Sequence, residues 1–256
     1  MCSDPDSRPP VEATPDGNVP AQAVHLVAGD GNRFSAYQAD AIRPTGAGIL
    51  VLPDYYGLTG FYQELALRFA EAGIDALALD YYGRTAAAPP RDRSFDHRDH
   101  ARMTTWAGLQ ADVAAASAHL RFHRRVRSLF SVGFCFGGRT SFLLASSASL
   151  DMAGVIGFYG WPVGRFLNDT PAPVDMVSSN RAPVLAIFGG ADAKIPSSDV
   201  ELFRRALQRV DLPHEVRSYA GAPHSFFDHA QPAQAEAAAD AWKRVLGFIA
   251  ANTART

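Results

Sequence analysis

The sequence predicts an α/β protein with a mostly parallel, doubly wound sheet and helices on both faces. Short apolar segments typical of buried strands alternate with helical segments along most of the chain, which is the pattern of a parallel sheet. The chain has 256 residues, of which 47% are hydrophobic, enough to form one well-packed domain. Because residues 1–20 are rich in Pro, Asp and Ser, we expect a disordered tail there and a single domain over residues 21–256.

The first half of the predicted domain begins with a β-hairpin. Two alternating segments flank the turn Gly-Asp-Gly-Asn at residues 29–32, and such turns connect antiparallel strands. A continuous apolar run then indicates a central parallel strand. The expected elements are strands at 24–28, 34–39, 48–52 and 74–79, and a helix at 61–72 closed by Gly73.

The second half continues the alternation after a long polar connection at residues 85–99. Connections of that length are commonly functional or disordered. An irregular segment is expected at 160–181. The remaining expected elements are helices at 101–123, 140–145, 197–210 and 233–250, and strands at 128–132, 154–159, 184–188 and 214–219.

Composition narrows the classes of partner and compartment. The formal net charge is −2, from 24 basic and 26 acidic residues, so we expect no nucleic-acid or anionic-membrane partner. No apolar run approaches membrane-spanning length, and residues 1–6 lack the apolar core of a signal peptide. With two cysteines, Cys2 and Cys135, a disulfide framework is not expected, and the cytoplasm is the expected location.

The segment Gly-Phe-Cys-Phe-Gly at residues 133–137 has the pattern of a nucleophile elbow. A nucleophile on a sharp strand-to-helix turn has strained backbone angles and crowded neighbours, so residues two before and two after must be small. The turn places Cys135 at the N-terminus of a helix, where the helix dipole favours a thiolate. The alternative is a small core cysteine, which is a common use of this residue.

Three further candidates follow predicted strands, where functional residues of such sheets gather. They are Asp54, Asp192 and His224. Cys135, Asp192 and His224 occur in the order nucleophile, acid, histidine, which is the order of the α/β-hydrolase fold. Alternatives exist for each residue: Asp192 suits a turn, His224 could lie in a surface loop, and Asp54 could cap the next helix.

Several motifs together resemble the dienelactone hydrolase family of the α/β-hydrolase superfamily. They are GFCFGGR at 133–139, GGAD at 189–192 followed by Ile195 and Pro196, GAPHSFF at 221–227, DYYGR at 80–84 and DAWKR at 240–244. The resemblance implies Cys135 as nucleophile, His224 as general base and Asp192 as its orienting acid. It also implies an oxyanion hole from the backbone N–H groups of Tyr55 and Phe136.

Two positions depart from the family pattern, and one match concerns the substrate. Asp54 stands where the type enzymes carry a glutamate that pairs with the resting thiol, so Asp54 is the expected thiol partner. Asp228 stands where they carry a second carboxylate-binding arginine, and its negative charge would repel a carboxylate substrate. The resemblance implies that Arg84 binds a substrate carboxylate, and the alternative is a salt bridge with the acidic loop at 92–99.

Aromatic residues near predicted strand ends suggest a pocket for a small aromatic or cyclic substrate, although core packing is the alternative for each. The set is Tyr56, Tyr82, Tyr159, Trp161 and Phe226. His97 and His100 have a spacing that could hold a metal, but the charged loop lacks a cysteine partner, so we expect no metal site and no cofactor.

These observations predict a hydrolase of ester or lactone bonds that acts on a small molecule through a thioester intermediate. The chain is expected to be a monomer or a homodimer. The alternative is a non-catalytic or weakly catalytic small-molecule binding protein on the same fold, because a fold does not determine a function.

Overall fold

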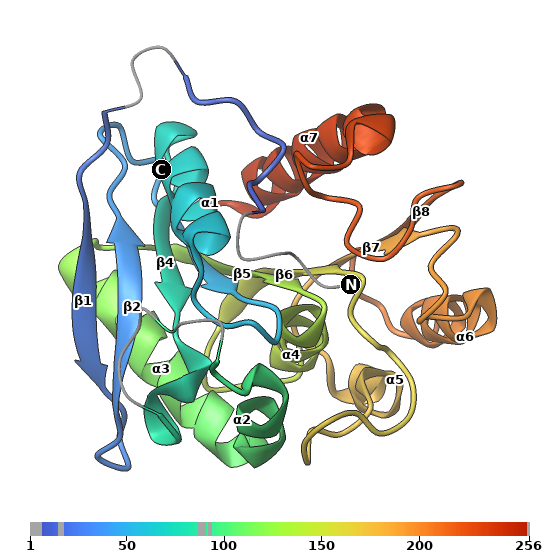
Figure 1. Ribbon diagram of the computed structural model, residues 1–256, viewed down its shortest axis with the longest axis horizontal. Helices are drawn as coiled ribbons and strands as arrows, with labels where there is room; N and C mark the ends of the chain where they lie inside the picture. Colours follow the sequence, from blue (N-terminus) through green and yellow to red (C-terminus); the bar gives the residue numbers. More distant parts are fainter. Residues whose placement is uncertain (1–6, 15–17, 87–90, 92–93, 255–256) are drawn as a thin grey trace.

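The computed structural model describes residues 7–14, 18–86, 91 and 94–254 (Figure 1). Its centre is one eight-stranded sheet in the order β1-β2-β4-β3-β5-β6-β7-β8. Helices α1 and α7 lie on one face of this sheet, and α3, α4 and α6 lie on the other. The strands are β1 (Ala21–Val27), β2 (Arg33–Ala39), β3 (Ala47–Leu52), β4 (Asp75–Leu79), β5 (Ser128–Phe134), β6 (Met152–Phe158), β7 (Val184–Gly189) and β8 (His214–Tyr219).

The sheet topology confirms the predicted fold class. Strands β1 and β2 form the expected antiparallel hairpin, and β2 also pairs antiparallel with β4. All other neighbouring strands run parallel. At the hairpin turn Gly31 has a φ of 87°, a left-handed conformation that glycine adopts without a Cβ penalty.

The two strands at the centre of the sheet determine where the site forms. Every residue of β3 and β5 is buried, which explains their continuous apolar sequences. In register, Leu52 lies opposite Gly133, and Phe134 lies opposite Phe158. The carboxyl ends of β3, β5 and β6 are therefore level, and the residues that follow them meet at one edge of the sheet.

The long helices agree with the sequence except between residues 97 and 123, and the short α5 and η2 lie in the segment expected to be irregular. The expected helix over 101–123 is two helices, because Thr104 and Thr105 have extended backbone conformations. The hydroxyl of Thr105 accepts a hydrogen bond from the N–H of Gly108 (3.1 Å) and so caps the second helix. The helices are α1 (Gly60–Glu71), α2 (His97–Met103), α3 (Trp106–His123), α4 (Phe136–Leu144), α5 (Pro173–Met176), α6 (Ser197–Leu207) and α7 (Ala235–Asn252), with 3₁₀ turns η1 (Tyr81–Arg84), η2 (Val177–Ser179) and η3 (Pro232–Gln234).

The connection expected over residues 85–99 is partly ordered by an ion pair. Arg91 donates two hydrogen bonds to the carboxylate of Asp80, at 2.8 and 2.7 Å, and its guanidinium lies over the rings of Tyr82 and Phe95. Helix α2 begins inside this connection at His97. Residues 87–90 and 92–93 lie outside the described part of the chain.

The N-terminal segment contacts the domain at the loop after β8. The hydroxyl of Ser7 donates to Asp228 (2.6 Å), and the N–H of His229 donates to the carbonyl of Arg8 (2.9 Å). Ser7 is buried. The expected tail is thus anchored at residues 7 and 8, while residues 1–6 and 15–17 lie outside the described part.

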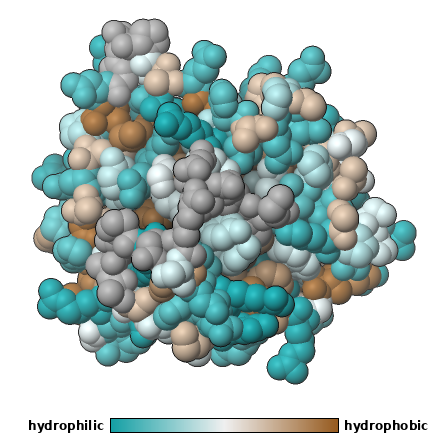
Figure 2. All heavy atoms as spheres, in the orientation of Figure 1, coloured by the Kyte–Doolittle hydropathy of each residue, from teal (hydrophilic) through white to brown (hydrophobic). Residues whose placement is uncertain are grey.

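The visible surface is mainly polar. On the face in Figure 2, hydrophilic side chains surround small, separate apolar patches, as on most folded domains. Among the described residues, no helix combines the length and apolar character needed to cross a bilayer.

Candidate active site

The elbow between β5 and α4 has the geometry that its glycines predict. Cys135 has φ 53° and ψ −109°, a strained combination for a residue with a side chain. A Cβ at Gly133 would overlap the carbonyl of Gly137, and a Cβ at Gly137 would overlap the carbonyl of Leu52. Both positions therefore require glycine because backbone segments approach each other there.

Cys135 lies at the N-terminus of α4 and is fully buried. Its N–H donates to the carbonyl of Phe158 at the end of β6 (3.0 Å), which ties the elbow to the neighbouring strand. The first N–H groups of α4 and the positive end of the helix dipole lie beside the thiol, an arrangement that stabilises negative charge. Both features would reduce the cost of a negative charge on the sulfur.

Asp192 and His224 form a buried pair beyond β7 and β8. Nδ1 of His224 lies 2.7 Å from Oδ2 of Asp192. The other oxygen of Asp192 accepts the N–H groups of Lys194 (2.8 Å) and Ile195 (3.2 Å), which fix the carboxylate. Burial acts to raise the pKa of Asp192, but His224 and the two backbone donors hold it below its usual value. A charged Asp192 can therefore orient the imidazole and stabilise its protonated form.

Asp54 organises the turn that follows β3. Its carboxylate accepts the N–H of Tyr56 (2.9 Å), and its carbonyl accepts the N–H of Gly57 (3.0 Å). Its own N–H donates to the hydroxyl of Tyr62 (2.9 Å). The hydroxyl of Tyr82 donates to the carbonyl of Tyr55. The turn that carries the expected oxyanion donor Tyr55 is therefore held by hydrogen bonds on several sides.

Asp54 and Cys135 act on the same buried tyrosines. Burial raises the pKa values of Tyr62, Tyr81 and Tyr82 well above 10, and the charges of both Asp54 and Cys135 raise each of them further. The three hydroxyls thus lie within electrostatic reach of both groups. A pairing of Asp54 with the Cys135 thiol stays a prediction.

Aromatic side chains connect the histidine to the elbow. The rings of Tyr159 and Trp161 each have centroids 5.0 Å from that of His224. Trp161 also packs on Phe166 (4.7 Å), which in turn contacts Phe136 (6.0 Å). Trp161 and Phe166 are partly exposed, so they can form a wall that a substrate touches.

Arg139 holds this wall, although sequence reasoning gave it no role. It is 1% exposed and donates to the carbonyls of Trp161 (3.0 Å), Gly164 (2.8 Å), Thr170 (3.1 Å) and Pro171 (2.9 Å). Burial lowers its pKa to about 10, and the charge of Asp175 opposes that shift. The signal in the sequence was a charged residue inside the apolar helix FGGRTSFLL.

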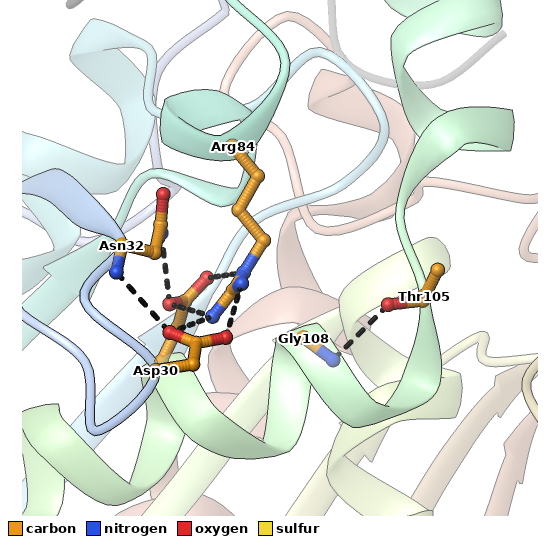
Figure 3. Close-up of polar contacts among 6 residues, drawn as sticks. Asp30, Asn32, Arg84, Thr105 and Gly108 are labelled. Atoms are coloured by element: carbon orange, nitrogen blue, oxygen red, sulfur yellow. Dashed lines mark hydrogen bonds and ion pairs between the residues drawn. The ribbon is translucent and has the colours of Figure 1, made fainter.

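Arg84 lies between two carboxylates (Figure 3). It contacts Asp112 of α3 at 3.0 and 2.8 Å and Asp30 of the hairpin turn at 2.6 and 3.2 Å. Burial opposes its charge, but both acids hold its pKa above the usual value. The expected alternative, a salt bridge, is therefore present, and its partners among the described residues are Asp30 and Asp112. Substrate binding by Arg84 would require it to leave them.

The remaining candidates divide by exposure. Tyr82 and Phe226 are fully buried, and Tyr159 is 1% exposed. Phe226 packs on Phe158, Tyr159 and Tyr219, which favours core packing over substrate contact. Tyr56 is partly exposed and lies against Tyr55 and His97, so substrate contact stays a prediction for Tyr56, as for Trp161.

Asp228 is buried against the N-terminal segment. It accepts hydrogen bonds from the hydroxyl of Ser7 (2.6 Å) and the N–H of Ala230 (2.9 Å). No three or more acidic, His or Cys side chains of the described residues are placed to hold a metal ion. The expectation that the protein uses no metal or cofactor stays a prediction.

A nucleophile elbow, an acid–histidine pair and this strand order define the class of α/β hydrolases. Comparison with known proteins gives the family. A profile of the Dienelactone hydrolase family matches residues 34–253, and the chain belongs to that family.

Individual relatives agree with this assignment. The chain is 31% identical over 252 residues to a Salmonella typhimurium protein named "Putative carboxymethylenebutenolidase", covering 93% of this chain and 89% of the relative. It is 28% identical to a Bradyrhizobium protein named "Probable 2-oxo-3-(5-oxofuran-2-ylidene)propanoate lactonase", covering 78% and 82%. A Klebsiella pneumoniae structure titled "Putative Dienelactone Hydrolase" superposes with a TM-score of 0.76 at 27% identity, covering 90% of this chain and 99% of the other.

Proposed function

We propose that the protein hydrolyses ester or lactone bonds with Cys135 as nucleophile and a thioester as intermediate. The observation that carries the proposal is the strained Cys135 at the N-terminus of a helix, with the Asp192–His224 pair beyond neighbouring strands. Relatives named as a carboxymethylenebutenolidase and a lactonase support the choice of ester and lactone bonds.

In the proposed reaction His224 takes the proton of the Cys135 thiol, and the resulting thiolate attacks the substrate carbonyl carbon. A sulfur–carbon bond forms, and the carbonyl electron pair moves to oxygen, where the N–H groups of Tyr55 and Phe136 receive it. The tetrahedral species collapses to a thioester and expels an alkoxide, which takes a proton from His224. His224 then removes a proton from water, which attacks the thioester. The sulfur–carbon bond breaks, the acid is released, and the Cys135 thiolate takes the proton back from His224.

Asp54 has two tasks in this proposal. Its carboxylate holds the turn that carries Tyr55, and its charge lies in the same neighbourhood as Cys135. A carboxylate beside a thiol opposes formation of the thiolate. Asp54 would therefore keep the resting thiol protonated and limit its oxidation.

The proposed substrate is a small ester or lactone with a cyclic or aryl group. Trp161 and Phe166 offer partly exposed aromatic surface beside His224 and Phe136, and such surface binds flat apolar groups well. The proposal gives no role in substrate binding to Arg84, because two carboxylates already bind its guanidinium.

The test compares wild-type protein with Cys135→Ala and Cys135→Ser on short-chain aryl esters and on small lactones. We expect Cys135→Ala to lose at least about 10³-fold in kcat/KM with an unchanged circular dichroism spectrum. Turnover by Cys135→Ala near the wild-type rate would refute the proposal. Tight binding without turnover in wild-type protein would favour the alternative of a binding protein.

A further inference from the structure

Tyr81 stands at the edge of the sheet where the site residues gather. It directly follows Asp80 at the carboxyl end of β4 and opens the turn η1. Strand β4 pairs in parallel with β3, with Val51 opposite Ala78. The turn after β3, which carries Asp54 and Tyr55, is therefore its neighbour across the sheet edge.

The hydroxyl of Tyr81 is buried and has no hydrogen-bond partner within the described part of the chain. The whole residue is 2% exposed. Its neighbours differ, because the hydroxyl of Tyr62 accepts the N–H of Asp54 and that of Tyr82 donates to the carbonyl of Tyr55. Most buried polar groups in proteins have a partner, and an exception at a site calls for an explanation.

The surroundings of Tyr81 link it to the reacting atoms. Its ring packs edge-on against Phe136, with centroids 5.3 Å apart, and Phe136 is the residue that follows the nucleophile. Burial raises the pKa of Tyr81, and the charges of Tyr82, Asp54 and Cys135 raise it further. Tyr81 is thus a neutral phenol at ordinary pH, able to donate a hydrogen bond.

An unpaired buried hydroxyl costs free energy in the resting protein. That cost disappears when an acceptor arrives in the same buried space. A substrate oxygen beside Cys135 is such an acceptor, and it becomes a stronger one when negative charge develops on it. A donor that is idle at rest and used in the transition state favours the chemical step.

We propose that Tyr81 is a catalytic residue whose hydroxyl donates a hydrogen bond to the substrate carbonyl oxygen during attack by Cys135. This inference rests on the proposed function and deepens it. The sulfur–carbon bond forms, the carbonyl electron pair moves to oxygen, and Tyr81 stabilises that oxygen while keeping its own proton. The thioester carbonyl then reforms, and His224 supplies the proton for the leaving alkoxide.

The decisive variant is Tyr81→Phe, which removes the hydroxyl and keeps the ring against Phe136. We expect kcat on a short-chain aryl ester to fall at least about tenfold, as when an oxyanion donor is lost, with little change in KM. The midpoint of urea unfolding should stay constant or rise, because an unpaired buried group has been removed. Loss of activity without loss of stability separates this role from a structural one.

Tyr219→Phe is the matched control. The residue is also buried, but its hydroxyl donates to Asp240 (2.7 Å), so we expect a lower urea midpoint and unchanged kinetics. If Tyr81→Phe instead lowers the midpoint as Tyr219→Phe does, its hydroxyl has a partner in the resting protein and the inference is wrong. Kinetics of Tyr81→Phe within about twofold of wild type would also overturn it.

A second probe keeps this inference separate from the proposed function. The Cys135 thiolate can add to the carbonyl carbon of an aryl trifluoromethyl ketone, and the carbonyl electron pair then moves to oxygen. The adduct has no leaving group, so it forms without turnover. We expect Tyr81→Phe to bind it at least about tenfold more weakly than wild type. Equal affinity refutes the role of Tyr81 whatever the turnover assays give, whereas activity retained by Cys135→Ala refutes the proposed function.

Discussion

Two arginines near the site illustrate opposite uses of the same side chain. Arg139, on the elbow helix α4, is buried and donates to four backbone carbonyls of residues 161–171. Arg84, in the turn η1 that follows β4, is partly exposed and lies between the carboxylates of Asp30 and Asp112. Arg139 therefore holds the loop at residues 161–171 by hydrogen bonds to uncharged carbonyl groups. Arg84 joins the β1–β2 hairpin to α3 by ion pairs.

A sequence motif therefore gives the position of a charged side chain but not its partners. The segment DYYGR brings Arg84 to the sheet edge, as the family resemblance implies. Its partners come from residues far away in the sequence, Asp30 and Asp112, and two negative charges more than balance one guanidinium. A basic residue at a family's substrate-binding position can thus be committed to the fold.

Removing Arg139 should have the largest effect on stability. Arg139→Met leaves four buried or half-buried carbonyls without their donor, so we expect a loss of at least about 3 kcal/mol in the free energy of unfolding. The segment that holds Trp161 and Phe166 should become less ordered. The ratio of kcat/KM for aryl acetates to kcat/KM for alkyl acetates should therefore fall. Urea unfolding and paired ester assays measure both effects.

Arg121→Met is the control for Arg139→Met. Arg121 also donates to backbone carbonyls, those of Leu150 and Asp151, but on a partly exposed surface. We expect it to cost less than about 1 kcal/mol and to leave substrate selectivity unchanged. If Arg139→Met had the same small effects as this control, the loop would be held by other contacts.

Replacing Arg84 should have a smaller effect. Arg84→Met leaves the carboxylate of Asp112 buried without its main partner, and we expect a loss of about 1–3 kcal/mol at neutral pH. Burial raises the pKa of Asp112, while Arg84 and Asn32 lower it, so the variant should raise this pKa further. Because a raised pKa favours the folded state at low pH, the stability deficit should shrink on acidification through that pKa.

The double variant Arg84→Met with Asp112→Asn sharpens the comparison. It removes the unpaired buried charge, so we expect it to be more stable at neutral pH than Arg84→Met alone. In each variant, we expect the fold-change in kcat/KM to be the same for neutral esters and for esters that bear a carboxylate. A selective loss on the carboxylate esters would show that Arg84 binds substrate.

The sequence predicted most of the fold because the fold depends on local patterns. The apolar runs of β3 and β5 and the turn at residues 29–32 lie where the periodicity and turn chemistry indicate. The break at Thr104 and Thr105 was missed because no glycine or proline marks it in residues 101–107, and the capping hydroxyl of Thr105 is evident only from its contact with Gly108.

The site was predictable where a motif fixes backbone geometry and not where contacts are long-range. The elbow glycines and the strand-end positions of Asp192 and His224 follow from local sequence. The contacts of Arg84 with Asp30, of Ser7 with Asp228 and of Arg139 with residues 161–171 join segments far apart in the chain. No pattern within one segment could reveal them.

The most direct test of the central proposal is to trap the acyl-enzyme. His224→Ala keeps Cys135 but removes the base that activates water, so an activated aryl ester should acylate the protein faster than the thioester is hydrolysed. We expect one acyl group per chain, located on the Cys135 peptide by mass spectrometry and released by hydroxylamine. Absence of that adduct in His224→Ala, together with ester turnover by Cys135→Ala, would contradict it.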